Sequence, residues 1–304
     1  KKGSKMFLRS ALAAALVAAA AADAAPTMRL RGGAPVTWKK LTGGADALSE
    51  GYGTASKVEI NHASDLNGDS TIKTTFVRDS ANKITALFNA KSSYQGVNLS
   101  ADVDGSGTIS GEASYDEVIP GASLTVSGKL EGGKAVKDMA APKISTEYRK
   151  DNAVVCASVE GSNLVASGVV EAGDFQVGAS TTYDANDGSM GDPSFGARYK
   201  GGNFAVTAVA NGLKGDDITA TYTQTVSGDL DVAGAFSTDG NKFSVGANYK
   251  LDSDASVRGK INSDGILNVG YARQLTKGAS LNAGLEVDTN NMDNRKVGLS
   301  LKVN

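Results

Sequence analysis

From about residue 53 to its C-terminus, the chain alternates almost without interruption between apolar and polar residues. In the stretch 255–262, Val257 and Ile261 fall on one face, while Arg258 and Lys260 fall on the other. A period of two residues is that of a β-strand, whose successive side chains point to opposite faces. Charge on one face and apolar groups on the other mean that each strand separates two different environments. The nature of those environments decides what the chain can be.

Turn residues divide the alternating region into about nineteen segments, as antiparallel hairpins require. Asn67-Gly68, Asp239-Gly240 and Asp264-Gly265 are examples of these turns. No part of the region shows helical periodicity over a comparable length, so we expect a nearly all-β, antiparallel fold. The predicted strands begin near Thr54, Ser70, Asn82, Gln95, Gly107, Ala122, Pro142, Asn152, Asn163, Asp174, Pro193, Asn203, Asp217, Asp229, Asn241, Ala255, Ile266, Ala279 and Arg295.

Three all-β architectures compete for this pattern. A soluble sandwich or barrel would have to split so many strands into two or three domains, yet no linker or change of composition marks a boundary. A solenoid would show a short internal repeat, and none is visible. In the terminal segment, Lys296 and Lys302 fall on one face of the strand, and Val297, Leu299 and Leu301 fall on the other. Lysines are rarely buried in a soluble core, whereas the water-filled lumen of a transmembrane barrel accommodates them, so we predict such a barrel.

The composition excludes several classes of function. The chain has 31 Lys and Arg against 33 Asp and Glu, which argues against a nucleic-acid surface. A single cysteine excludes an intrachain disulfide framework, and a single histidine leaves few groups for catalysis. We expect no enzymatic activity, no cofactor and no metal. His62 and Cys156 are interpreted as polar groups at strand ends.

One segment imitates the beginning of a calcium-binding EF-hand loop. It starts at Asp102 and Asp104, but its twelfth position is Ala113 where such a loop needs glutamate. Flanking helices are not predicted either. We therefore interpret this segment as a hairpin turn.

The N-terminal 53 residues differ from the rest. Residues 1–27 combine basic residues with an alanine-rich run, which is typical of a secretory signal or of the first half of a plastid address; an upstream extension absent from the working protein is the alternative. Residues 28–53 include an amphipathic helix that lies either on the membrane surface or inside the pore. We expect this gating helix to present Trp38, Lys39, Lys40, Leu41 and Leu48, with hinges at Gly43, Gly44, Gly51 and Gly53. Residues 54–304 form the barrel.

The hairpin from Tyr249 to Tyr271 carries a resemblance to a known family. Its spacing resembles the signature of eukaryotic porins, the voltage-dependent anion channels of mitochondria. The residues that match are Tyr249, Asp252, Ala255, Gly259, Lys260, Ile261, Asn262 and Ser263. The resemblance implies a barrel of nineteen strands, and an odd number makes the first and last strands pair in parallel. It also implies that the helix lies in the lumen.

The same resemblance implies a wide, voltage-dependent pore for small anions, ATP, ADP and other metabolites. Membrane lipids and further copies of the chain are the implied partners, with no nucleic acid. The mitochondrial outer membrane is the expected location, and a plastid envelope or another endomembrane is the alternative. Animal members carry a membrane-facing glutamate on the fourth strand, where this chain has Ala101. We therefore do not expect this chain to have the functions that depend on that glutamate in the animal members.

The alternation assigns a set of charged residues to the lumen. The acidic members are Glu147, Glu160, Asp231 and Glu286, and we expect mild anion selectivity from the basic excess. A solvated charge at a strand end is the alternative for each single lysine. A protein-import barrel of the same superfamily and a secreted adhesive β protein remain alternative functions. The predicted basic pore-lining residues are Lys73, Lys83, Lys129, Lys143, Arg149, Lys242, Lys250, Arg258, Lys260, Lys296 and Lys302.

Overall fold

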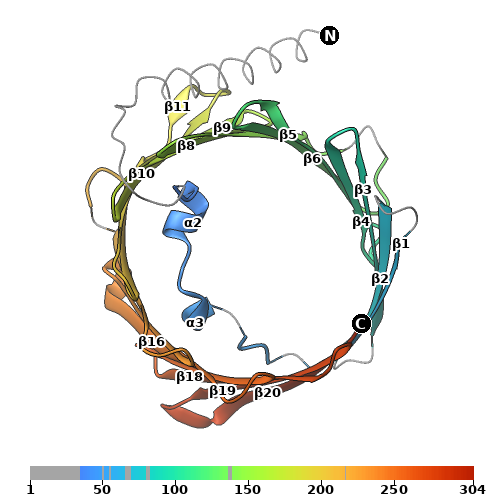
Figure 1. The fold of residues 1–304 in the computed structure, drawn as a ribbon, viewed down its shortest axis with the longest axis vertical. Helices are drawn as coiled ribbons and strands as arrows, with labels where there is room; N and C mark the ends of the chain where they lie inside the picture. Colours follow the sequence, from blue (N-terminus) through green and yellow to red (C-terminus); the bar gives the residue numbers. More distant parts are fainter. Residues whose placement is uncertain are drawn as a thin grey trace.

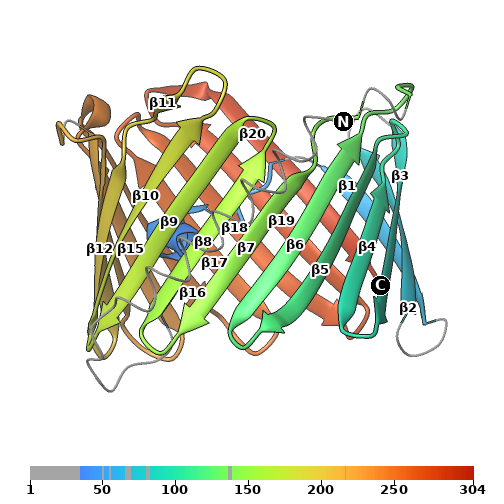
Figure 2. The ribbon, with the colours of Figure 1, turned by 90° about the horizontal axis from the view of Figure 1, so that it is seen from above.

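The computed structural model describes residues 35–49, 51–54, 56–65, 70–79, 83–135, 139–215 and 217–304. In these ranges the strands form one closed sheet around a wide lumen, as the view along the barrel axis shows (Figure 1). The expected leader, residues 1–27, lies outside the described residues. The side view shows that all strands are strongly tilted with respect to the barrel axis (Figure 2).

Nineteen strands make the wall, which confirms the predicted fold and strand number. A further two-residue strand, β11, pairs only with the end of β10 and extends that hairpin. The strands are β1 (Lys57–Asp65), β2 (Ser70–Asp79), β3 (Ile84–Tyr94), β4 (Val97–Val103), β5 (Ile109–Ile119), β6 (Ala122–Leu130), β7 (Lys143–Lys150), β8 (Ala153–Glu160), β9 (Asn163–Ala172), β10 (Phe175–Asp184), β11 (Ser189–Met190), β12 (Ser194–Lys200), β13 (Phe204–Asn211), β14 (Asp217–Thr225), β15 (Leu230–Ser237), β16 (Lys242–Lys250), β17 (Ala255–Asn262), β18 (Ile266–Thr276), β19 (Ala279–Asp288) and β20 (Asn291–Val303).

The barrel closes through one parallel pair. Every wall strand pairs antiparallel with its successor, whereas β1 and β20 run parallel, with Lys57 opposite Ser300 and Ile60 opposite Val303. The parallel pairing that the odd strand number implies is thus confirmed. Its register covers four residue pairs, against nine between β1 and β2.

Two predicted strand boundaries were wrong by several residues. The first strand begins at Lys57 instead of Thr54, because Thr54 lies against the lumen side of Gly298 in β20. The last strand begins at Asn291 instead of Arg295. Its first four residues are Asn291-Met292-Asp293-Asn294, which lack the apolar alternation on which the prediction relied.

The expected single helix is two short helices, α2 (Trp38–Thr42) and α3 (Asp46–Ser49). Both lie inside the barrel (Figure 1). Gly43 leaves the helical conformation, with φ −57° and ψ 134°, so the helix breaks at the predicted glycine pair. Each glycine weakens a helix by about 1 kcal/mol relative to alanine, which favours the break. Within the described ranges, no helix combines the length and apolarity needed to cross a bilayer.

Candidate functional site

Strand register assigns each side chain of the wall to one of two faces. Lys260 donates a hydrogen bond from Nζ to the carbonyl of Leu48 in α3 at 2.8 Å, so its side chain points into the lumen. Lys260 is opposite Asn268, which is opposite Glu286. These residues therefore share the lumen face, and their immediate neighbours in each strand share the outer face. Val297 and Leu299, on the outer face of β20, remain 68% and 54% exposed.

The outer face carries a continuous row of aromatic rings near one rim of the barrel. Phe175, Tyr199 and Phe204 contact one another in sequence, with ring centroids 4.8 and 5.7 Å apart, and Tyr222 follows at 6.1 Å. Tyrosines and other aromatic residues gather where a membrane meets water, and barrel proteins carry such girdles at both interfaces. An apolar outer band that ends in an aromatic row is the surface expected of a wall embedded in lipid.

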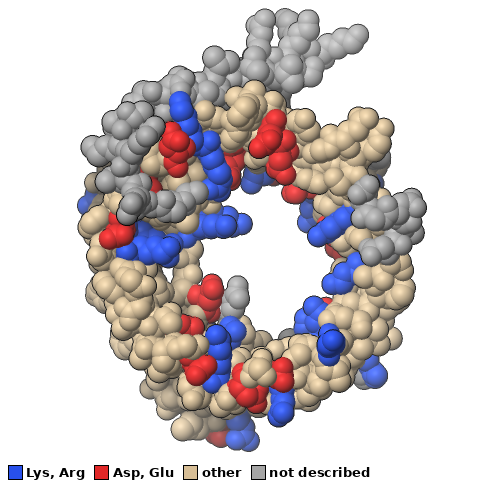
Figure 3. All heavy atoms as spheres, in the orientation of Figure 1, with Lys and Arg blue, Asp and Glu red and all other residues tan. Residues whose placement is uncertain are grey.

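The lumen face carries charges of both signs. A view along the axis shows lysines and arginines on several sides of the opening, with acidic groups between them (Figure 3). Register places the four predicted acidic residues and all predicted basic residues that lie in strands on this face; Lys83 directly precedes β3. Lys296 forms an ion pair with Glu286 at 2.8 Å, and Arg149 pairs with Glu147.

The sequence prediction missed several charged residues on the same face. Lys91 and Asp102 face the lumen from β3 and β4, and Glu112 does so from β5. Arg198 lies on the lumen face of β12, opposite Gln176 of β10. Each of them alternates with outward-facing residues in its strand, so the alternation that identified the others contained the signal for these too.

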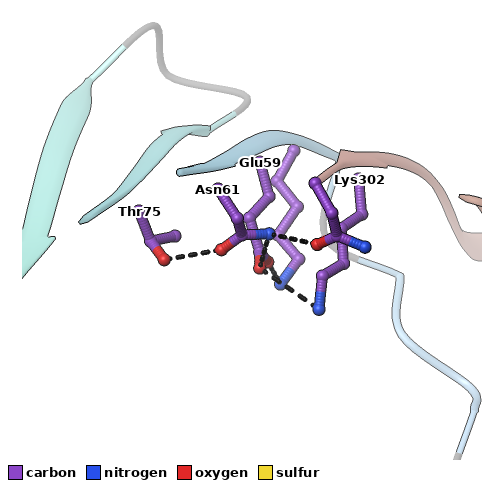
Figure 4. Close-up of polar contacts among 6 residues, drawn as sticks. Glu59, Asn61, Thr75 and Lys302 are labelled. Carbon is purple, nitrogen blue, oxygen red and sulfur yellow. Dashed lines mark hydrogen bonds and ion pairs between the residues drawn. The ribbon is translucent and has the colours of Figure 1, made fainter. Parts of the chain in front are cut away.

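A polar network lines the lumen beside the parallel seam (Figure 4). The carboxylate of Glu59 in β1 lies 3.3 Å from the Lys57 ammonium and 3.7 Å from that of Lys302 in β20. Asn61 donates to Glu59 at 3.1 Å and accepts from the Thr75 hydroxyl at 2.6 Å. The network thus links β20, β1 and β2 through side chains where the backbone pairing is shortest. Ion pairs and hydrogen bonds of this kind stabilise most when they form a connected set.

The helices lie on a row of small residues in the wall. An ideal Cβ on Gly196 would lie 2.7 Å from Leu41 Cδ2 and 3.0 Å from Trp38 Cζ3. On Gly246 it would lie 3.0 Å from the carbonyl oxygen of Ala47 in α3. Leu41 is only 1% exposed. The missing side chains therefore let α2 and α3 approach the strand backbone closely.

The segment that leaves α3 follows the same row. Ideal Cβ atoms on Gly270 and Gly284 would lie 2.2 and 2.1 Å from the carbonyl oxygens of Gly51 and Gly53. Gly51 itself has φ +79°, a conformation that side chains disfavour. Carbonyl oxygens occupy the space that side chains would take, so a side chain at either wall position would displace the segment. We call the lumen-facing glycines the glycine path: Gly178, Gly196, Gly246, Gly270, Gly284 and Gly298.

The signature hairpin owes its turn to one of its matched residues. The Asn262 side chain accepts hydrogen bonds from the backbone N–H groups of Asp264 at 3.1 Å and Ile266 at 2.9 Å. Gly265 follows with φ +76°. Ser263 is tied to the neighbouring hairpin by its N–H, which donates to Phe243. Lys260 contacts α3, whereas Tyr249, Gly259 and Ile261 lie on the outer face.

The segment that imitates a calcium loop is a hairpin turn between β4 and β5. The Asp104 carboxylate accepts hydrogen bonds from the N–H of Ser106 at 2.8 Å and of Thr108 at 3.0 Å, and from the Ser106 hydroxyl. These bonds, the hydroxyl's first, lower the pKa of Asp104. Among the described residues, no group of three or more His, Cys, Asp or Glu side chains could hold a metal ion.

Two single residues lie elsewhere than predicted, and a third lies where the resemblance placed it. Cys156 is in the middle of β8 on the lumen face, with Sγ 4.0 Å from a Glu147 carboxylate oxygen, so the strand-end interpretation was wrong for it. It was also wrong for His62, which is inside β1. Both prediction errors arose because isolated residues give no period. Ala101 faces outward from the fourth strand, opposite Ala90.

Comparisons with known proteins find relatives of this chain. A frog (Xenopus laevis) protein named "Non-selective voltage-gated ion channel VDAC2" is 27% identical over 85% of this chain and 94% of its own. A potato "Mitochondrial outer membrane protein porin of 34 kDa" is 27% identical over 70% of this chain and 78% of its own, and a Drosophila melanogaster "Voltage-dependent anion-selective channel" is 27% identical over 63% and 70%. A mutant of the Rh. blastica porin overlaps 80% of this chain at 10% identity and a TM-score of 0.43. The family model described as "Eukaryotic porin" matches residues 34–298, so the chain belongs to the eukaryotic porin family.

Proposed function

We propose that the chain forms a voltage-dependent diffusion pore of an outer membrane. The observation that carries the proposal is a closed wall with two chemically different faces. The outer face is apolar and carries a row of aromatic rings near one rim on β10–β14, and the inner face is charged and surrounds an open lumen (Figure 3). A wall of this kind holds a water-filled passage in lipid. The names of the frog and fly relatives support the voltage dependence.

The permeants we propose are small anions, ATP, ADP and other metabolites. Anion preference is mild in this proposal, because Glu286, Glu147 and Glu59 lie among the lumen lysines and partly neutralise them. Rings of charge bias a wide pore through the local potential rather than through a tight site. The mitochondrial outer membrane is the proposed location, supported by the name of the potato relative, with a plastid envelope as the alternative. Membrane lipids and further copies of the chain are the proposed partners.

The proposed gate is the N-terminal segment, residues 28–53, within the barrel of residues 54–304. Its parts are the side chains Trp38, Lys39, Lys40, Leu41 and Leu48 and the hinges Gly43, Gly44, Gly51 and Gly53. The position of α2 and α3 in the lumen supports this proposal, since their movement would change the free cross-section (Figure 1). The breaks at Gly43 and Gly51 supply points where the backbone can bend.

Reconstitution into a planar bilayer tests the function. We expect stepwise conductance, partial closure at high voltage of either sign, and a reversal potential in a KCl gradient that indicates mild anion preference. Clear cation selectivity would contradict the lumen assignment, and absence of conductance would contradict the pore. Carbonate washing separates the barrel, which stays in the membrane, from a secreted adhesive protein, which is released. Imaging a C-terminal tag against mitochondrial and plastid markers tests the location.

A further inference from the structure

Two cations of the wall hold the α2–α3 segment by its backbone, one at each end. Before α2, Arg149 of β7 donates a hydrogen bond from its guanidinium to the carbonyl of Pro35 at 3.0 Å. At the end of α3, Lys260 of β17 donates from Nζ to the carbonyl of Leu48 at 2.8 Å. The neighbouring strands β8 and β16 lie well apart on the wall, with α2 and α3 between them (Figure 1). The two contacts therefore fix the segment from separate parts of the barrel.

Lys260 makes a second contact with the segment. Its ammonium lies 4.8 Å from the centroid of the Tyr52 ring, and the Tyr52 hydroxyl donates to the carbonyl of Ala47 at 2.5 Å. The last carbonyl groups of a helix lack partners within the helix, and a lysine near the C-terminus can bond to them. Lys260 and Tyr52 together thus supply donors to two carbonyl groups at the end of α3.

The two wall cations differ in how they are oriented. The Arg149 guanidinium is paired with Glu147 of the same strand through Nε, which leaves Nη1 to reach Pro35. Lys260 takes part in no ion pair within the described residues, so its charge acts on the carbonyl and on the ring. Both residues point at the segment, although the sequence pattern alone assigns them to the pore lining.

We propose that Arg149 and Lys260 are positioning residues of the gate, which hold the segment against the wall and oppose closure. The proposal rests on the pore function and adds two wall residues to the gate of residues 28–53. Their positive charge matters, because hydrogen bonds from charged donors are roughly twice as strong as neutral ones. The contact with the Tyr52 ring also requires a cation. A neutral amide of similar length therefore replaces neither residue.

The test follows the two ends of the segment separately in the full chain, reconstituted in lipid. Trp38 is the single tryptophan and packs on Gly196, so quenching of its fluorescence by acrylamide reports the start of the segment. The Leu48 amide donates to the carbonyl of Ala45 at 2.9 Å, so deuterium exchange of a peptic peptide that covers residues 45–53 reports its end. The half-closure voltage in a planar bilayer reports the gate.

We expect each variant to loosen its own end of the segment. Lys260→Gln should speed exchange of the peptide at least about tenfold, and Arg149→Gln should instead raise the quenching of Trp38, because a charged hydrogen bond is lost in each case. A tenfold loss corresponds to a half-closure voltage lower by about 60 mV if closure moves one elementary charge. Lys260→Arg should restore native exchange and the native voltage, since a guanidinium can both donate to a carbonyl and stack on a ring.

Lys91→Gln is the matched control for the charge. It removes a lumen lysine from β3, on the side of the opening away from the helices (Figure 1). We expect Lys91→Gln and Lys260→Gln to shift the reversal potential alike, whereas exchange and half-closure voltage change for Lys260→Gln alone. Tyr52→Leu leaves the wall intact and should also speed exchange. Added to Lys260→Gln, it should have little further effect, because the two residues form one contact.

The outcomes separate these contacts from the pore. Equal exchange in Lys91→Gln and Lys260→Gln overturns the contact at Lys260, and faster exchange at the native half-closure voltage overturns its role in the gate. Both results leave a conducting pore in place. A native chain that conducts no current overturns the pore, while exchange and quenching still show whether the wall cations hold the segment.

Discussion

The contact between Gly284 and the exit of α3 makes a sharp prediction for Gly284→Ala. The new Cβ would lie 2.1 Å from the carbonyl oxygen of Gly53 and 2.8 Å from its carbonyl carbon. Since backbone atoms cannot rotate away as a flexible side chain can, the segment has to move by about 1 Å or more to reach an ordinary contact distance. The wall strand itself tolerates alanine, so the strain falls on the segment.

Overpacking of this kind costs about 1–3 kcal/mol. We take about 2 kcal/mol, which lowers the preference of the segment for the wall by roughly thirtyfold. One elementary charge that crosses the whole membrane potential is worth about 2.3 kcal/mol per 100 mV. If closure requires the segment to leave the wall, the half-closure voltage therefore falls. The fall is about 90 mV if closure moves one elementary charge across the membrane potential, and about 45 mV if it moves two.

The measurement is the half-closure voltage of single channels in a planar bilayer. Gly259→Ala is the matched control, because an ideal Cβ on this outward-facing strand glycine meets nothing within 4 Å. We expect Gly259→Ala to close at the native voltage and Gly284→Ala to close at a smaller one. If both variants close at the native voltage, the segment does not leave the wall during gating, and the reasoning fails.

Three further predictions concern the wall. Leu299→Arg puts a charge on the lipid face of β20, which costs about 2–4 kcal/mol of barrel stability if the position lies near the bilayer midplane. Ser300→Arg is the control, because its side chain faces the lumen. The yield of membrane insertion should fall for Leu299→Arg alone. Asn262→Ala removes the side-chain acceptor of the signature turn, and the heat-induced unfolding temperature in detergent should drop as expected for about 1 kcal/mol per lost hydrogen bond. Glu59→Gln breaks the ion pairs with Lys57 and Lys302 at the parallel seam, so the same unfolding transition should depend less on salt, and Lys302→Gln, which leaves the Lys57 pair in place, should reduce that dependence less.

The fold was largely predictable because a barrel repeats one simple rule. Alternation with a period of two identifies each strand, and the tight turns separate them, so the strand number and the lumen face of Lys73 or Lys296 follow from local sequence. The boundaries of the first and last strands did not follow. Thr54 does not join β1, because it contacts Gly298, which is more than two hundred positions away in the sequence. No local pattern contains such a contact.

The sequence predicts which residues face the lumen, but not which of them lie close together. The pattern identifies Arg258 and Lys260 as lumen residues, and it could have identified Arg198 in the same way. It cannot show that the two arginines line one cavity, because that depends on where the link at Gly43–Gly44 crosses the wall. The glycine path was missed for a related reason. A glycine in a strand usually indicates a weak position or a bulge, and only the docked segment shows why the polar face needs it.

The glycine path and the parallel seam are connected through the chain itself. After α3 the segment passes Gly270 and Gly284, reaches Gly298 at Thr54, and enters β1 at Lys57, whose first four residues pair with β20. The tether between Ser49 and the seam is therefore short, and its end is fixed by the wall. A segment held in this way cannot leave the lumen by sliding along the wall. It can pivot where the chain enters β1, so a large gating movement that lifts Gly51 and Gly53 from the wall swings α2 and α3 together away from β9–β17 while Thr54 stays at Gly298.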